Sequence, residues 1–339
     1  RAFAETWPDH PEANLNRIDW AAALFLMKDR SDDAEKQLRL AEQDENDPHI
    51  QYLARLRLAE WYSSVGRIPE ARAILRRLMD SEQTAARDRG AACLAMAALL
   101  EAQNENDAAL IALERSDAWD LPDESRHRIR LAQGRILLKT GSIEKGRLLI
   151  RETIRLAPAL PESADTFLFV ARYLANQQQW ESAWKKYSQY LETFPQHPGT
   201  RQVLIERARC LVPLNRFSEA AAEYERLIEQ AADDPVLRFV ALRGAADTRF
   251  SNQEPDAARK LYQRLMEESP DSRTVLEAEF QIAETFRAGG RFADAELAFQ
   301  RFIERHPESP DTEQARLHLA LIAEQTQQWT VALNRYDTL

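Results

Sequence analysis

A small residue recurs along the chain every 37 or 38 positions, and in most copies a large apolar residue follows it four positions later. The clearest copy lies at 290–310, where Ala295 precedes Phe299 and Phe302 and is followed by Pro307. We call these small residues the markers; they are Ala34, Ala71, Ala108, Gly146, Ala183, Ala220, Ala258, Ala295 and Ala332. A fixed period of this length predicts nine similar units, each burying its apolar face against its neighbours.

Each unit also has an earlier half. A small residue stands twelve positions before most markers, at Ala22, Ala59, Gly134, Ala171, Ala208, Ala246, Ala283 and Ala320, whereas the third unit has Met96 there. Five positions before four markers stand Gly66, Gly141, Asn215 and Gly290, residue types that adopt the left-handed conformation ending a helix. Prolines such as Pro270 and Pro307 then stop the second half. Each unit is therefore predicted to be a hairpin of helix A and helix B.

Composition supports an all-α fold and argues against several classes of protein. Only 9 of the 339 residues are glycine, well below the roughly 7% of an average protein, and no glycine-rich phosphate-binding motif occurs. A formal charge of −10 argues against nucleic-acid binding. The longest apolar run, 91–100, is much shorter than the roughly 20 residues that cross a bilayer, so we expect no direct membrane insertion.

Residues suited to catalysis or metal binding do not group in the sequence. The six histidines are scattered, and no two have the i, i+4 spacing of a helical metal site. Cys93 and Cys210 lie in apolar helical runs, as expected of buried small side chains. We therefore expect no catalytic residue, no cofactor and no metal ion, and a protein that is not an enzyme.

The small, aromatic and proline positions together resemble the tetratricopeptide repeat over essentially the whole chain. Two departures are a step longer than the usual 34 residues and the absence of that family's Trp early in helix A. Residues 302–320 resemble the variant found in bacterial envelope proteins, among them the lipoprotein of outer-membrane β-barrel assembly and the periplasmic coordinator of Tol–Pal. The resemblance implies an all-α superhelix, or solenoid, of about nine helix-turn-helix repeats.

The period divides the chain into a single repeat array. We expect repeats at 15–51, 52–88, 89–126, 127–163, 164–200, 201–238, 239–275, 276–312 and 313–339. Residues 1–14 are expected to be the tail of a preceding repeat, because Phe3, Pro8 and Pro11 match Phe302, Pro307 and Pro310. We expect a fragment of a longer protein, whose exposed ends allow self-association.

In the family that the chain resembles, partners bind a concave wall formed by positions 2, 5, 6, 9, 12 and 13 of helix A. Position 9 reads Ala23, Glu60, Ala97, Arg135, Arg172, Arg209, Asp247, Glu284 and Leu321. The three successive arginines predict a ladder that docks an acidic peptide, since a guanidinium binds carboxylates bidentately. The alternative is that these arginines pair with acidic residues of neighbouring helices.

Other side chains extend this candidate docking surface. The fourth unit is locally basic, with Arg128 and Lys139 near Arg135, and Phe169 falls at position 6 of the fifth unit. Trp184 stands beside a marker and is expected to be only partly buried; partner binding and core packing are both open to it. The predicted partner-binding set is Arg128, Arg135, Lys139, Phe169, Arg172, Trp184 and Arg209.

Two functions are compatible with these observations. The first is a non-enzymatic scaffold that docks partner proteins or peptides in its groove, within a bacterial envelope or secretion assembly and with the periplasm favoured over the cytoplasm. The second is the regulatory or sensor array of a larger multidomain enzyme or signalling protein. The full-length gene product would separate them.

Overall fold

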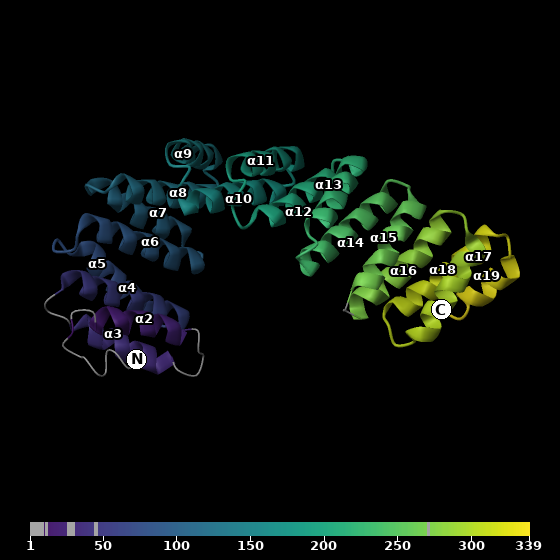
Figure 1. Cartoon of the computed structure of the whole chain (residues 1–339), viewed down its shortest axis with the longest axis horizontal. Helices are drawn as coiled ribbons and strands as arrows, with labels where there is room; N and C mark the ends of the chain where they lie inside the picture. Colours follow the sequence, from purple (N-terminus) through teal and green to yellow (C-terminus); the bar gives the residue numbers. More distant parts are fainter. Residues whose placement is uncertain (1–9, 11–12, 26–30, 44–46, 270–271) are drawn as a thin grey trace. The chain divides into compact units, whose positions relative to one another are not determined.

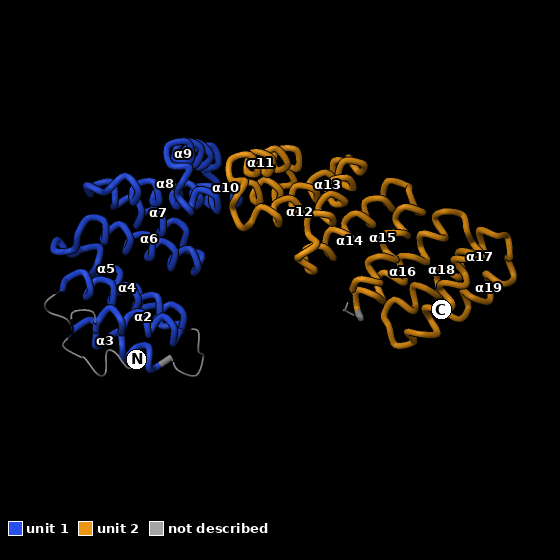
Figure 2. The backbone as a smooth tube through the Cα atoms, viewed as in Figure 1, with its two compact units in different colours: residues 1–169 blue, residues 170–339 orange. Residues whose placement is uncertain are grey.

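The computed structural model describes residues 10, 13–25, 31–43, 47–269 and 272–339. The chain forms two compact units, residues 1–169 and 170–339, as Figure 2 shows. The predicted positions Phe3, Pro8, Pro11 and Pro270 lie outside the described residues.

The all-α prediction is confirmed, since the described residues form helices α2 to α19 and a 3₁₀ turn with no strand (Figure 1). Unit 1 contains α2 (Ala13–Phe25), α3 (Ser31–Glu42), α4 (Pro48–Ser64), α5 (Ile68–Asp80), α6 (Ala86–Ala102), α7 (Asn106–Glu114), η2 (Arg115–Ala118), α8 (Asp123–Lys139) and α9 (Ile143–Leu156). The unit division falls within α10 (Pro161–Asn176). Unit 2 continues with α11 (Trp180–Thr193), α12 (Thr200–Leu211), α13 (Phe217–Gln230), α14 (Pro235–Ser251), α15 (Pro255–Glu268), α16 (Ser272–Ala288), α17 (Phe292–Arg305), α18 (Asp311–Gln325) and α19 (Trp329–Tyr336).

Even-numbered helices correspond to helix A of each predicted repeat and odd-numbered helices to helix B. Within each unit, a helix B packs both on its own helix A and on the helix A that follows, as α13 does with α12 and α14. The predicted stack of hairpins is therefore present in both units. Helix A starts slightly before the predicted repeat boundary, for example at Pro48 in the repeat expected at 52–88.

The markers lie where helix A meets helix B, with one correction. Most are fully buried, as Ala71, Ala183 and Ala295 are, but in the third repeat the buried residue is Ala109 and not the predicted Ala108. Moving this marker by one also brings Ala97, 2% exposed, to the small position of helix A in place of Met96. In α2 the buried small residue is Ala21, and the predicted Ala22 is only half-buried.

Glycine at both contact positions lets α8 and α9 approach closely. A Cβ added to Gly146 would lie 2.7 Å from the carbonyl oxygen of Gly134, and one added to Gly134 would lie 2.4 Å from Cγ1 of Ile150. Side chains at these two positions would therefore force the helices apart.

The turn between helix A and helix B is the same in eight repeats. Each has one residue with positive φ five positions before the corrected marker: Gly66, Asn104, Gly141, Gln178, Asn215, Gln253, Gly290 and Gln327. In most of these turns the next amide donates to a carbonyl five residues earlier, as Arg291 does to Phe286 at 2.9 Å. This is the Schellman arrangement. The positive φ at Gly66, Gly141, Asn215 and Gly290 confirms the four predicted stops.

Buried side chains form a continuous core in unit 1 from Ile18 to Ile136. Unit 2 holds two further clusters, around Tyr224 and Tyr262 and around Phe280 and Phe299. Leu333, Tyr336 and Leu339 at the end of the chain are exposed. Among the described residues, no helix combines the length and apolar character needed to cross a membrane.

Candidate docking groove

The corrected marker changes one residue on the helix-A wall. Position 9 of the third repeat is Ala98, which is exposed, whereas the predicted Ala97 is buried. The markers that define Arg135, Arg172 and Arg209 as position 9 are unchanged by this correction. Arg135 belongs to unit 1, and the other two arginines belong to unit 2.

The three arginines of the predicted ladder have different environments. Arg172 makes a bidentate ion pair with Glu206 of α12, with Nη2–Oε1 at 2.7 Å and Nε–Oε2 at 2.9 Å. Arg209 lies beside Tyr224. Burial raises the pKa of the Tyr224 phenol to about 12, and the charge of Arg209 opposes this rise. For Arg135, no carboxylate lies within ion-pair distance in the part of the chain that the structure describes.

The remaining predicted partner-binding residues are engaged within the protein. Arg128 pairs with Glu124 at 2.9 Å and with Glu162 at 3.1 Å. The Lys139 ammonium pairs with Glu101 at 2.5 Å and lies 5.7 Å from the ring centroid of Phe169. The Arg216 guanidinium covers Trp184, 4.5 Å from its ring centroid. The alternative of structural ion pairs therefore holds for Arg128, Lys139 and Arg172, and their role in partner binding stays a prediction.

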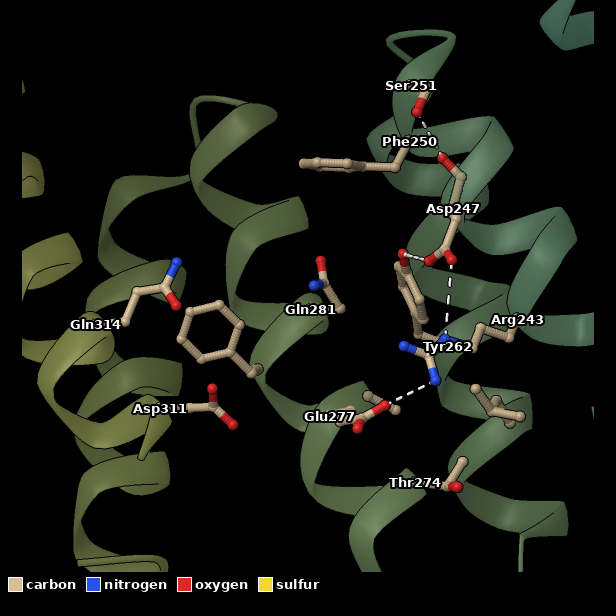
Figure 3. Close-up of a pocket in the computed structure, with 13 residues that line it drawn as sticks. Arg243, Asp247, Phe250, Ser251, Tyr262, Thr274, Glu277, Gln281, Asp311 and Gln314 are labelled. Atoms are coloured by element: carbon tan, nitrogen blue, oxygen red, sulfur yellow. Dashed lines mark hydrogen bonds and ion pairs between the residues drawn. The ribbon is translucent and has the colours of Figure 1, made fainter. Parts of the chain in front are cut away.

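A cavity of about 450 Å³ opens on the helix-A side of the last three repeats (Figure 3). It is lined by Arg243, Asp247, Phe250, Ser251, Tyr262, Leu265, Thr274, Glu277, Ala278, Phe280, Gln281, Asp311 and Gln314. These side chains come from α14, α15, α16 and α18. Several occupy the positions by which the resembled family binds partners, namely position 9 for Asp247, 6 for Gln281 and 2 for Gln314.

A second cavity, of about 990 Å³, continues the first because Glu277 and Asp311 line both. Its other walls include Leu276, Pro307 and Pro310. We call the two cavities together the α14–α18 groove.

Asp247 is held from two sides inside the groove. The Tyr262 hydroxyl donates to its Oδ1 at 2.6 Å, and Arg243 Nε lies 3.9 Å from its Oδ2 (Figure 3). Removal from bulk water raises the pKa of Asp247, the charge of Glu277 adds to the rise, and Tyr262 and Arg243 oppose it. About 54% of the side chain is nevertheless exposed, so this carboxylate lies in the groove and is still open to a ligand.

The first cavity carries more negative than positive charge. Its carboxylates are Asp247, Glu277 and Asp311, and its one cation among the lining residues is Arg243. Arg243 Nη1 already pairs with Glu277 Oε2 at 2.8 Å. No cationic side chain pairs with the Asp311 carboxylate among the described residues. The sequence analysis missed this site because it compared position 9 alone. Positions 2 and 5 add Glu277 and Arg243, whereas Asp311 precedes position 1 of its repeat and joins the site only because α18 begins there.

The groove carries the chemistry of binding. The walls of its first cavity offer carboxylates, one guanidinium, two amides and the rings of Phe250 and Phe280, and the second cavity adds the guanidinium groups of Arg273 and Arg305. In the described part of the chain, no group of three potential metal ligands is present. Cys93 and Cys210 are buried as expected, and burial raises the pKa of each thiol to about 12.

Comparisons with known proteins agree on the architecture. A family model described as tetratricopeptide repeat matches residues 171–235, 205–273 and 280–337. No curated protein shows a significant match to the sequence.

Two solved structures show the same fold. One is the C-terminal part of a tetratricopeptide repeat-containing protein from Cytophaga hutchinsonii, with 13% identity, a TM-score of 0.58, and coverage of 77% of this chain and 98% of that one. The other is a signal transduction ATPase with numerous domains and a tetratricopeptide repeat sensor, from Pyrococcus horikoshii. It has 13% identity and a TM-score of 0.53, and the match covers 97% of this chain but 53% of that one.

Proposed function

Because the chain belongs to the tetratricopeptide repeat family, we propose that it is a non-enzymatic scaffold that docks a segment of a partner protein in the α14–α18 groove. Repeats of this family make protein–protein interaction scaffolds, and the family positions of helix A line the cavity. The observation that carries the proposal is this cavity, which spans helix A of three successive repeats.

The groove suits an extended peptide because its walls come from helix A of three successive repeats. The groove is open along its length, and it passes from the carboxylates of the first cavity to the prolines of the second. An extended chain advances about 3.3 Å per residue, so a short segment contacts several repeats at once. Contacts spread over three helices let each repeat contribute to affinity and specificity.

A peptide-display selection tests the groove directly. Random peptides would be selected on the parent chain and then measured on Gln314→Trp, in which an indole fills one wall. Glu313→Trp is the matched control, because Glu313 is also exposed in the first turn of α18 but does not line the groove. Selected peptides should bind the parent and the control and lose most of their affinity for Gln314→Trp. Peptides that bind all three proteins equally would contradict docking in the groove.

A regulatory or sensor role within a larger protein is the second candidate. It is supported by the structural match over 97% of this chain to a protein whose repeats are described as a sensor, a likeness of fold alone. The sequence of the full-length gene product tests it: an ATPase, kinase or protease domain on the same polypeptide would favour the sensor.

For the cellular setting we propose the bacterial envelope, supported by the resemblance of residues 302–320 to envelope repeats. Fractionation of host cells with an antibody to this chain tests the proposal. Recovery with the periplasm or membranes would support it, and recovery with the cytosol would contradict it.

A further inference from the structure

We propose that the segment docked in the α14–α18 groove is basic, with a Lys or Arg side chain that enters between Asp247 and Asp311. This inference rests on the proposed function and adds the chemistry of the partner. It also reverses the acidic partner that the arginine ladder had suggested.

The charge of the first cavity carries the inference. Three carboxylates face one guanidinium, and that guanidinium is 2.8 Å from Glu277. The Asp247 carboxylate receives a hydrogen bond from the neutral Tyr262 hydroxyl, and its nearest guanidinium, that of Arg243, is 3.9 Å away and shared with Glu277. A cationic side chain would compensate this excess charge, whereas a carboxylate would increase it.

The two arginines that line the second cavity are already paired with carboxylates. Arg273 pairs with Glu277 at 3.2 Å, and Arg305 pairs with Glu279 at 3.0 Å. Glu277 therefore has two guanidinium partners, Arg243 and Arg273, and neither arginine of the second cavity is left unpaired for an acidic partner. Among the described residues, the carboxylate of the first cavity that pairs with no cation is Asp311.

The walls also suit a long cationic side chain. Phe250 extends from α14 towards α16 in Figure 3, and Phe280 lines the same cavity. Aromatic faces attract ammonium and guanidinium groups and cover their alkyl stems. Thus the cavity offers a charged end for the head group and apolar walls for the stem.

Two amides can hold the backbone of the docked segment. Gln281 of α16 and Gln314 of α18 line the cavity, and each carries both a donor and an acceptor. Figure 3 shows them on neighbouring helices, with Asp311 close to Gln314. An extended peptide that crosses from α16 to α18 would meet an amide at each repeat, so recognition of the backbone accompanies recognition of the basic side chain.

Fluorescence polarisation with three labelled peptides tests the inference. Each has about nine residues, enough to span three repeats, and alternates alanine with lysine, glutamate or glutamine. The proteins are the parent chain, Asp311→Asn, Asp247→Asn and the control Glu313→Gln. Glu313 shares the first turn of α18 with Asp311 but lies outside the groove, so the control removes one negative charge without changing the site.

The lysine peptide should bind the parent and Glu313→Gln alike, and about threefold or more weaker to each aspartate variant. Its affinity should fall with added salt. Tighter binding of the glutamate or glutamine peptide than of the lysine peptide would overturn the basic partner. If Gln314→Trp abolished that binding, docking in the groove would still be supported. A lysine peptide that fails to bind, or binds all variants equally, also overturns the inference. If peptides from the display selection bind Gln314→Trp as tightly as the parent, docking in the groove itself is contradicted.

Discussion

Arg172 and Glu206 stand 34 positions apart and form a bidentate ion pair between helix A of one repeat and helix A of the next. They occupy positions 9 and 6 of successive repeats. Glu284 and His318 have the same spacing, and the Glu284 carboxylate lies 2.6 Å from His318 Nδ1. Position 9 of one repeat therefore faces position 6 of the following repeat. A charged side chain at position 9 is available to a partner protein only where the residue at position 6 does not neutralise it.

This relationship predicts unequal roles within the arginine ladder. Replacing Arg172 with Ala leaves Glu206, whose side chain is 15% exposed, without its guanidinium and should lower the free energy of unfolding by about 0.5–1 kcal/mol. Arg135→Ala should change it by less, because no described carboxylate pairs with Arg135. Urea unfolding followed by circular dichroism measures both. A double-mutant cycle with Glu206→Gln is the control, and a coupling energy of zero would contradict the pair's contribution.

The close approach of α8 and α9 gives a second prediction. Alanine has the higher helix propensity by about 1 kcal/mol, yet Gly146→Ala should lower stability because its Cβ would lie 2.7 Å from the Gly134 carbonyl oxygen. We expect a net loss of about 1–3 kcal/mol in urea unfolding. Lys145→Ala, an exposed substitution in the same helix, should have little effect. A Gly146→Ala variant as stable as its parent would mean that the helices can separate freely.

The common turn gives a pair of opposite predictions. Gln253 has φ of 61° and Gly290 has φ of 72° at the same turn position. Gln253→Gly should raise the free energy of unfolding by about 0.5–1 kcal/mol, because relief of left-handed strain exceeds the added entropy of the unfolded chain. Gly290→Gln should lower it by a similar amount. Thermal unfolding of the two variants would reveal the result, and changes of the same sign would be inconsistent with it.

Much of the fold follows from the sequence because close helix contacts require small residues at fixed spacing. The prediction for the third repeat was wrong by one residue because two adjacent alanines lie in the first turn of its helix B, and only packing distinguishes buried Ala109 from half-buried Ala108. The positive φ of Asn104 at the preceding turn follows from the same correction.

The site was harder to predict than the fold. Pairing of Arg172 depends on which side chain of the next repeat faces it, and that geometry is not a local property of the sequence. The excess negative charge of the first cavity is shared among Asp247, Glu277 and Asp311, which come from three helices, α14, α16 and α18. Each alone is an ordinary exposed or half-buried acid, so only their convergence in space marks a site.

The buried Glu284 carboxylate predicts acid sensitivity. Burial alone would raise its pKa, but hydrogen bonds from His318 and Arg287 overcome this effect and lower the pKa to about 2. Because the folded-state pKa lies below the unfolded value of 4.5, the stabilisation is complete above about pH 5 and is lost as the pH falls towards 2.

Glu284→Gln should remove that part of the pH dependence. Between pH 6 and pH 3 the parent should lose on the order of 2 kcal/mol more stability than the variant. Glu304→Gln, at an exposed position, serves as the control and should keep the slope of the parent. Urea unfolding at the two pH values measures the difference, and parallel losses in parent and Glu284→Gln would exclude this carboxylate as the cause.

The raised pKa of Asp247 predicts that binding of a basic segment depends on pH. Removal from bulk water and the nearby charge of Glu277 favour the neutral acid, against the hydrogen bond from Tyr262 and the charge of Arg243. As the pH falls through this raised pKa, Asp247 takes up a proton and its attraction for a lysine side chain is lost. The affinity of the lysine peptide should therefore begin to fall at a higher pH than the ordinary aspartate value of 3.8 would allow.

Asp247→Asn should flatten the upper part of this pH profile. Asp311→Asn should weaken binding but retain the pH dependence of the parent. Calorimetry in two buffers of different ionisation enthalpy provides an independent measurement, because bound lysine favours the ionised carboxylate and binding should release protons near the raised pKa. A profile that is identical in the parent and in Asp247→Asn would show that this carboxylate does not contact the bound segment, and it would contradict a basic side chain placed between Asp247 and Asp311.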